Sequence, residues 1–257
     1  MLPGVMAAIV SGIQHLRITA NAVDFDLFAA LGSPTAPVFY FVELANNVKL
    51  TASGPTVPGW KDDGIHPSSR IILRLPATGA IKGAGGRGGI GGVINTGAFP
   101  SEQSYYQAGG GGGAGEAIGG KGFGWPPFGQ DGADGSPTSG GSATGTAVLG
   151  TLTAIQSQTP PEDGGDAMRI SCAYEIYNAG AIWGGGGGGC GGVSIVPSSP
   201  NDPTAGGDPG QPGVAGFLAF GSPYQSAGGN AIRLVGSATA TFRSGASDPN
   251  VKGAVSA

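Results

Sequence analysis

The glycine residues of this 257-residue chain are distributed very unevenly, and that distribution limits what the chain can fold into. Residues 1–53 contain three of the 54 glycines, and residues 54–257 contain the other 51. The first stretch can bury side chains in the usual way. Because glycine brings no side chain to bury, the second stretch must be ordered largely through its backbone.

A period of three is visible in the glycine run at residues 84–93. Ala84, Arg87, Ile90 and Val93 stand three apart, and every residue between them is glycine. Three residues per turn is the repeat of the left-handed extended helix, whose backbone amides need partners outside the helix. A collagen-type triple helix needs long uninterrupted triplets, and the best run here has three. We therefore expect such helices to pack side by side as a polyglycine II bundle, bonded backbone to backbone.

The alternative for the glycine runs is a flexible linker. Linkers are usually rich in serine and charge, whereas these runs are flanked by isoleucine, valine, tryptophan and phenylalanine. We favour the bundle for this reason, and we expect the close backbone packing at a defined set of glycines. These bundle-forming residues are Gly85, Gly86, Gly88, Gly89, Gly91, Gly92, Gly110, Gly111, Gly112, Gly186, Gly187 and Gly188.

The stretch at residues 13–53 shows the alternation of apolar and polar residues that is typical of β-strands. Residues 38–42 are β-branched and aromatic, as strand residues commonly are. Residues 26–31 fit either part of a strand or a helical turn ended by Gly32. After a proline-containing loop, residues 70–75 are the last conventional strand before the glycine runs. We interpret the whole as a small antiparallel sheet or sandwich.

An internal repeat links strands to glycine runs. Residues 70–75 and 168–177 alternate as strands do, and each stretch leads through an isoleucine, Ile81 or Ile182, into a glycine run that ends in Gly-Gly-Val. A third strand at residues 232–235 lacks the run, as a terminal cap would. The repeat indicates that the glycine runs are part of an ordered structure.

These observations predict an all-β plus polyglycine II fold in two domains. Residues 1–76 are the N-terminal antiparallel β region, and residues 77–257 are the glycine-rich helix bundle with irregular loops. Aromatic side chains on rigid loops are common binding residues, because they bury much area at low entropic cost. The candidate binding residues are Phe99, Tyr105, Tyr106, Trp125, Phe128 and Tyr224.

The amino-acid composition argues against nucleic-acid binding, and the spacing of the histidine, cysteine and acidic residues argues against catalysis. Lys and Arg together number 12 and are scattered, unlike the basic surface of a nucleic-acid-binding protein. His15 and His66 have no carboxylate or cysteine at catalytic or zinc spacing. The acidic loops 131–135 and 162–166 match no calcium-loop spacing and are interpreted as solvated turns, with calcium binding as the alternative. Residues 62–64 are interpreted as a turn. We expect no enzymatic activity, no cofactor and no metal, whereas pairing of the two cysteines stays open.

Alternating strands that lead into glycine runs at Ile81 and Ile182, with aromatic loops, resemble the receptor-binding tip adhesins of tailed-bacteriophage fibres. The resemblance covers residues 70–257. It implies a virion component of the distal tail tip or fibre, made in the host cytoplasm, that recognises a bacterial surface receptor without chemistry. It also implies that residues 1–76 serve in attachment and that the candidate binding residues contact the receptor. The implied partners are other phage tail proteins and an outer-membrane protein or glycan. Because tail fibres are usually trimeric, a homotrimer or one copy on a trimeric tip is expected.

Three other functions stay open on the sequence. A purely structural tail-tip cap or connector would contact virion proteins alone. An ice-binding protein would need a flat face with a regular column of threonines, and the glycine runs contain none. A bacterial cell-surface glycine-rich protein would need an export signal, and residues 1–10 lack a basic region and are interrupted by Pro-Gly.

Overall fold

The computed structural model describes residues 5–10, 13–90, 92–94, 105–106, 110, 112–115, 132–143, 148–149, 159–191, 193–195, 204–218, 222–243 and 250–257. The chain divides into two compact units. We call residues 1–83, 166–184 and 230–257 the solenoid unit, and residues 84–165 and 185–229 the glycine-rich unit. The chain therefore leaves the solenoid unit twice, and these two insertions make up the glycine-rich unit.

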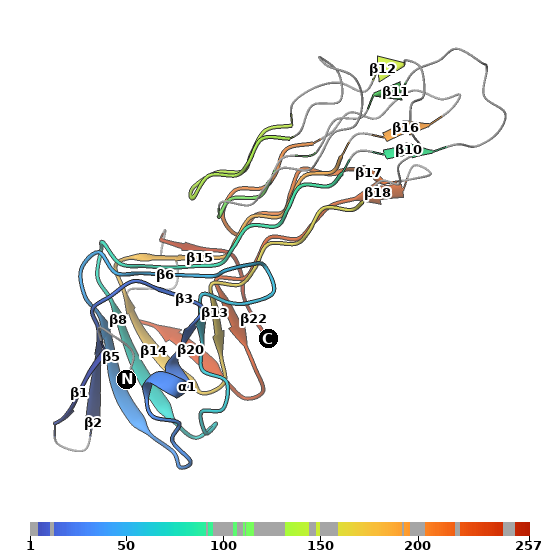
Figure 1. Cartoon of the computed structure of the whole chain (residues 1–257). Helices are drawn as coiled ribbons and strands as arrows, with labels where there is room; N and C mark the ends of the chain where they lie inside the picture. The colour runs from blue at the N-terminus through green and yellow to red at the C-terminus, as the bar shows by residue number, and fades with distance from the viewer. Residues whose placement is uncertain are drawn as a thin grey trace. The chain divides into compact units, whose positions relative to one another are not determined.

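Three sheets form the solenoid unit, and Figure 1 shows β5, β8, β14 and β20 of the first side by side. Sheet A contains β1 (Val5–Val10), β2 (Ile13–Ile18), β5 (Phe39–Leu44), β8 (Arg70–Leu75), β14 (Ala173–Asn178) and β20 (Thr239–Phe242). Sheet B contains β3 (Ala22–Val23), β6 (Lys49–Thr51), β9 (Ala80–Lys82), β15 (Ala181–Trp183) and β21 (Val251–Lys252). Sheet C contains β4 (Phe25–Asp26), β7 (Trp60–Lys61), β13 (Met168–Ile170), β19 (Ile232–Leu234) and β22 (Val255–Ser256).

Within the solenoid unit, successive strands from β2 onward belong to sheets A, B and C in rotation, so that each set of three makes one turn of a parallel solenoid. In sheet A, Tyr40 is the register partner of Gln14 in the preceding turn and of Ile71 in the following turn. Ile71 pairs in turn with Tyr174, although the whole first insertion lies between them in the sequence. Tyr174 pairs with Ala240 across the second insertion. Both insertions therefore leave and rejoin the solenoid without disturbing the parallel pairing of its turns.

The interior of the solenoid unit is filled by columns of apolar side chains that repeat from turn to turn. In-register parallel pairing places equivalent residues of successive turns directly above one another, so each side chain packs on its neighbours in the column. The fully buried members are Leu16, Val42, Leu73 and Ile176 in sheet A, Leu50, Ile81 and Ile182 in sheet B, and Trp60, Met168 and Ile232 in sheet C. Burial of these columns stabilises the turns that the hydrogen bonds align.

The predicted fold class is wrong in both of its parts. The β region at residues 1–76 pairs in parallel apart from β1 and β2, and it shares all three sheets with strands from the second half of the chain. The regular structure is nearly all β, and the described residues contain one short helix, not a polyglycine II helix bundle. Alternation locates strands without fixing their partners. Close backbone approach requires glycine whatever the backbone conformation, so the period of three did not identify a helix.

The helix α1 (Leu27–Ala30) confirms the second of the two interpretations of residues 26–31. The Asp26 side chain caps it by accepting a hydrogen bond from the backbone N–H of Ala29 at 3.1 Å. Leu27 is fully buried, and Gly32 follows with a φ of +79°. Among the described residues, no helix has the length and apolar character needed to cross a membrane.

Three two-stranded sheets occur among the described residues of the glycine-rich unit (Figure 1). Strand β10 (Gly92–Ile94) pairs in parallel with β16 (Val193–Ile195). Strand β11 (Tyr105–Tyr106) is antiparallel to β12 (Val148–Leu149), and β17 (Gly216–Leu218) is antiparallel to β18 (Ser222–Tyr224). The other described segments of the unit are neither helix nor strand, and backbone hydrogen bonds connect them to one another.

Candidate functional site

The glycine-rich unit is held together by backbone hydrogen bonds between segments that are far apart in the sequence. Segment 185–189 is the clearest case. Its N–H groups donate to the carbonyl oxygens of Gly165, Ala114, Gln211 and Glu162 at 2.8–3.0 Å, and its carbonyl oxygens accept from Gly229, Gly86, Gly207 and Gly89, each at 2.8 Å. Because the backbone of this segment is bonded to so many stretches of chain, little room is left around it for side chains.

Seven of the twelve predicted packing glycines lie where another stretch of chain approaches closely. A Cβ atom on Gly188, for example, would collide with the carbonyl oxygen of Arg87. Added Cβ atoms would come closer than 3.0 Å to another protein atom at Gly85, Gly86, Gly89, Gly110, Gly186, Gly187 and Gly188. Gly88 lies between two of these positions, Gly92 lies in β10, and Gly112 donates to the carbonyl oxygen of Ala133 at 3.0 Å. Gly91 and Gly111 lie outside the described residues.

The six candidate receptor-contacting residues all belong to the two insertions. Tyr105 and Tyr106 form β11 and pair with Leu149 and Val148. Tyr224 ends β18 and is half-buried; burial, with Asp163 and Cys190 contributing, raises the pKa of its hydroxyl. The other three candidates, Phe99, Trp125 and Phe128, lie outside the described residues.

The acidic stretch at residues 162–166 uses its carboxylates to hold neighbouring backbone. Asp163 accepts a hydrogen bond from the backbone N–H of Ala227 at 2.6 Å. Asp166 accepts one from the N–H of Asn230 at 2.9 Å and forms an ion pair with Arg233 at 2.7 Å. Within the part of the chain that the structure describes, no group of three or more metal-ligating side chains comes together.

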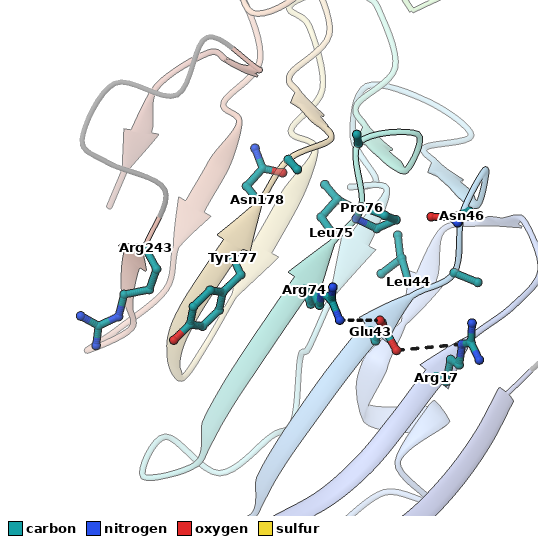
Figure 2. Close-up of a pocket in the computed structure, with 13 residues that line it drawn as sticks. Arg17, Glu43, Leu44, Asn46, Arg74, Leu75, Pro76, Tyr177, Asn178 and Arg243 are labelled. Carbon is teal, nitrogen blue, oxygen red and sulfur yellow. Dashed lines mark hydrogen bonds and ion pairs between the residues drawn. The ribbon is translucent and has the colours of Figure 1, made fainter.

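A groove of about 550 Å³ crosses the outer face of sheet A where its strands end (Figure 2). Arg17, Glu43, Arg74 and Tyr177 occupy equivalent positions on β2, β5, β8 and β14, so they form a row of one residue per turn. Arg243 follows β20 and lines the groove beside them. Residues 44–46, 75–77 and 178–179, at the strand ends and in the turns that follow, complete the lining.

Charge in this groove is predominantly positive. Glu43 is the one acidic residue of the lining, and it lies 4.0 Å from Arg17 and 3.2 Å from Arg74. Figure 2 shows the carboxylate between the two guanidinium groups, on neighbouring strands. Arg243 forms its ion pair with Glu175 at 3.2 Å. The side chain of Tyr177 is 47% exposed, which leaves an aromatic surface in a row of cations.

Sequence reasoning did not identify this groove. Arg17, Glu43 and Arg74 are far apart in the sequence, and they meet only because the chain completes a full turn between each and the next. The sequence does contain one sign of it: β2, β5 and β8 each end in an apolar residue that is preceded by a charged residue. That signal acquires meaning only after the parallel pairing is known.

A second group of polar residues lies inside the solenoid unit, around the buried carboxylate of Asp62. The carboxylate accepts hydrogen bonds from the backbone N–H of Ser171 at 2.7 Å and from the Tyr174 hydroxyl at 3.0 Å. The thiol of Cys172 donates to it at 3.6 Å, and the Trp60 indole N–H donates to the Tyr174 hydroxyl at 3.2 Å. The cluster satisfies buried polar groups in the core, which is a structural role. Both cysteines of the chain are free and buried.

Burial raises the pKa of Asp62 above its ordinary value of 3.8, although hydrogen bonds from Ser171 and Tyr174 lower it in part. A carboxyl whose pKa is raised in the folded state favours folding most below pH 3.8, and this contribution is lost as the pH rises through the folded-state pKa. We therefore expect the wild type to lose stability relative to Asp62→Asn as the pH rises through that range. Urea unfolding of both proteins at a series of pH values measures this difference, and a difference that is constant with pH would contradict the assignment.

Comparison with known families finds a similarity to one family of phage proteins over part of the chain. Residues 146–255 match the family model described as "Phage tail fibre adhesin Gp38". The matched range includes the whole second insertion and most of the later turns of the solenoid unit. No curated protein and no solved structure matches the chain.

The match confirms the resemblance to phage tail-fibre adhesins that the sequence predicts. It confirms the virion as the location of the protein, and it supports a role in host recognition at the tail fibre. An adhesin family is not a class of enzymes. The match does not test whether the glycine runs are a feature of this family.

Proposed function

We propose that the protein binds a receptor on the bacterial surface through the aromatic segments of its two insertions. The observation that carries this proposal is topological. Both insertions leave after a strand of sheet B, β9 or β15, and return at a strand of sheet C, β13 or β19. The turns of the solenoid therefore pair with one another without the inserted segments. The sequence of those segments can change without disturbing the buried columns of apolar side chains. Loops held by a rigid scaffold are where recognition residues concentrate.

The proposal assigns receptor contact to the inserted aromatic residues and attachment to the N-terminal region. Two features support the first assignment: the tyrosine pair at residues 105–106 belongs to a short sheet of the glycine-rich unit, and all six candidates belong to that unit. The receptor class is an outer-membrane protein or a glycan. The tail-protein partner is held through residues 1–76, and assembly as a homotrimer stays a prediction.

The test compares binding of the purified, fluorescently labelled chain to Gram-negative cells with binding of a variant in which Tyr105, Tyr106, Trp125 and Phe128 are alanine. Aromatic anchors usually carry much of the energy of an interface, so we expect binding at least about tenfold weaker. Circular dichroism establishes that the variant is folded.

A matched control changes Val23, which is 61% exposed in the solenoid unit, to alanine and should bind like the wild type. Unchanged binding by the folded four-residue variant would overturn the assignment to these aromatic residues. Equal loss in the Val23→Ala control would show that the effect is not specific to the insertions.

A further inference from the structure

The groove on the outer face of sheet A has no part in the proposed receptor contact, because its lining belongs entirely to the solenoid unit. Three arginines line it against one glutamate, in a chain whose net charge is −4. Exposed ion pairs contribute little to stability, so stability does not explain why these arginines lie together. The three arginines outnumber the two carboxylates that pair with them, Glu43 and Glu175. An excess of positive charge in a concave site favours an anionic ligand.

The arginine side chains have donors to spare for such a ligand. A guanidinium carries five N–H donors, whereas Glu43 offers two oxygens to both Arg17 and Arg74. The exposed fractions of the Arg17, Arg74 and Arg243 side chains are 54%, 63% and 49%, so their remaining N–H groups are accessible. Planar guanidinium groups bind carboxylate and phosphate in bidentate geometry.

The exposed ring of Tyr177 favours a sugar among the possible anionic ligands. It occupies the register position next to Arg74 in the row and exposes nearly half of its surface. The C–H face of a pyranose ring packs on an aromatic ring in this way, while the hydroxyl groups of the sugar hydrogen-bond to polar neighbours. The volume of the groove, about 550 Å³, lies within the range of small-ligand sites.

We propose that this groove binds an acidic sugar, with its carboxylate or phosphate held by Arg17, Arg74 and Arg243 and its ring on Tyr177. The site differs from the proposed receptor-contacting segments in unit, residues and chemistry. Because Arg17 and Arg74 lie within residues 1–76, the proposal requires that attachment to the tail leave this edge of sheet A accessible. It provides a second, charge-selective contact with an anionic glycan surface. Because guanidinium groups bind carboxylate and phosphate alike, experiment must decide which of the two the sugar carries.

The test uses the full chain and three probes: methyl glucuronide, glucose 6-phosphate and neutral methyl glucoside. Saturation-transfer NMR and titration calorimetry measure their binding at low ionic strength. We expect at least one acidic probe to bind with a Kd of about 10 mM or tighter and the neutral probe to show no saturable binding. Added salt should weaken the binding, because exposed charges are screened.

Two variants and a control assign the effect to the groove. Arg74→Gln should weaken binding of the acidic probe about tenfold by removing a charged, two-pronged partner. Tyr177→Leu should also weaken binding of the acidic probe, because it removes the aromatic ring on which the sugar packs. Arg233→Gln, on sheet C with a side chain 54% exposed, should bind like the wild type.

The relative affinities of glucuronide and glucose 6-phosphate then distinguish a carboxylate ligand from a phosphate ligand. Equal binding of the neutral probe, absence of binding by both acidic probes at about 10 mM, or an unchanged affinity in folded Arg74→Gln would overturn the proposal. Loss of cell binding in the aromatic variant leaves these outcomes unaffected, so the two proposals fail separately.

Discussion

Replacing Gly188 by alanine is expected to destabilise the glycine-rich unit by about 3 kcal/mol or to prevent its folding. The added Cβ would collide with the carbonyl oxygen of Arg87 and come within 2.5 Å of its carbonyl carbon. Both are backbone atoms, so no side chain can rotate away to make room. Moreover, the N–H of Gly188 donates to Glu162 at 2.9 Å and its carbonyl oxygen accepts from Ser226 at 2.5 Å, so a shift of this residue would break further hydrogen bonds.

Hydrogen exchange followed by mass spectrometry measures the loss of stability separately in the glycine-rich unit and in the solenoid unit. In Gly188→Ala, the amides of Gly86 and Gly113 should exchange much faster, whereas those of buried Leu73 and Ile176 should keep their protection. The control is Gly54→Ala, because a Cβ on Gly54 meets nothing within 4 Å and the change should stay within about 0.5 kcal/mol. Wild-type protection in Gly188→Ala would contradict the close packing described here.

Replacing Asp62 by alanine is expected to cost the solenoid unit about 3 kcal/mol or more. The substitution leaves the N–H of Ser171 and the hydroxyl of Tyr174 without their acceptor in a buried site. Each buried donor without a partner costs about 1–3 kcal/mol, and the lost carboxylate adds a small cavity. Urea unfolding monitored by tryptophan fluorescence measures the change, since Trp60 donates to Tyr174 within the same cluster.

The neighbouring residue supplies the matched control for that experiment. Asp63 forms an ion pair with Arg169, and its side chain is 46% exposed. An exposed pair of this kind contributes at most about 1 kcal/mol, so Asp63→Ala should be nearly neutral. Equal effects of the two substitutions would show that burial and hydrogen bonding of Asp62 do not matter as the structure indicates.

Strand positions in this chain are readable from the sequence, but strand partners are not. Composition predicts a strand at residues 38–42, which corresponds to β5 (Phe39–Leu44), and alternation predicts the strand at residues 70–75 because one face of it is buried. Their parallel pairing depends on the full turn of chain that separates them, which alternation within single strands does not reveal. The repeat at Ile81 and Ile182 held the missing information, since these residues are register partners in neighbouring turns of sheet B.

The candidate sites show the same division between local and long-range information. The turn at residues 62–64 is predictable from Asp-Asp-Gly, and the N–H of Ile65 does donate to the carbonyl oxygen of Asp62. Burial of the Asp62 side chain depends on Tyr174, which is distant in the sequence. Likewise, a glycine run predicts close backbone approach, yet the partners of Gly188 come from three other stretches of chain, which no local pattern specifies.

The central claim, host recognition by a tail-fibre adhesin, is tested most directly by binding of the purified, labelled chain to a broad panel of Gram-negative strains. The account predicts saturable binding to some strains and none to others, with competition by unlabelled chain. A panel without saturable binding to any strain would contradict a receptor-binding role for this chain and would favour a structural cap within the tail.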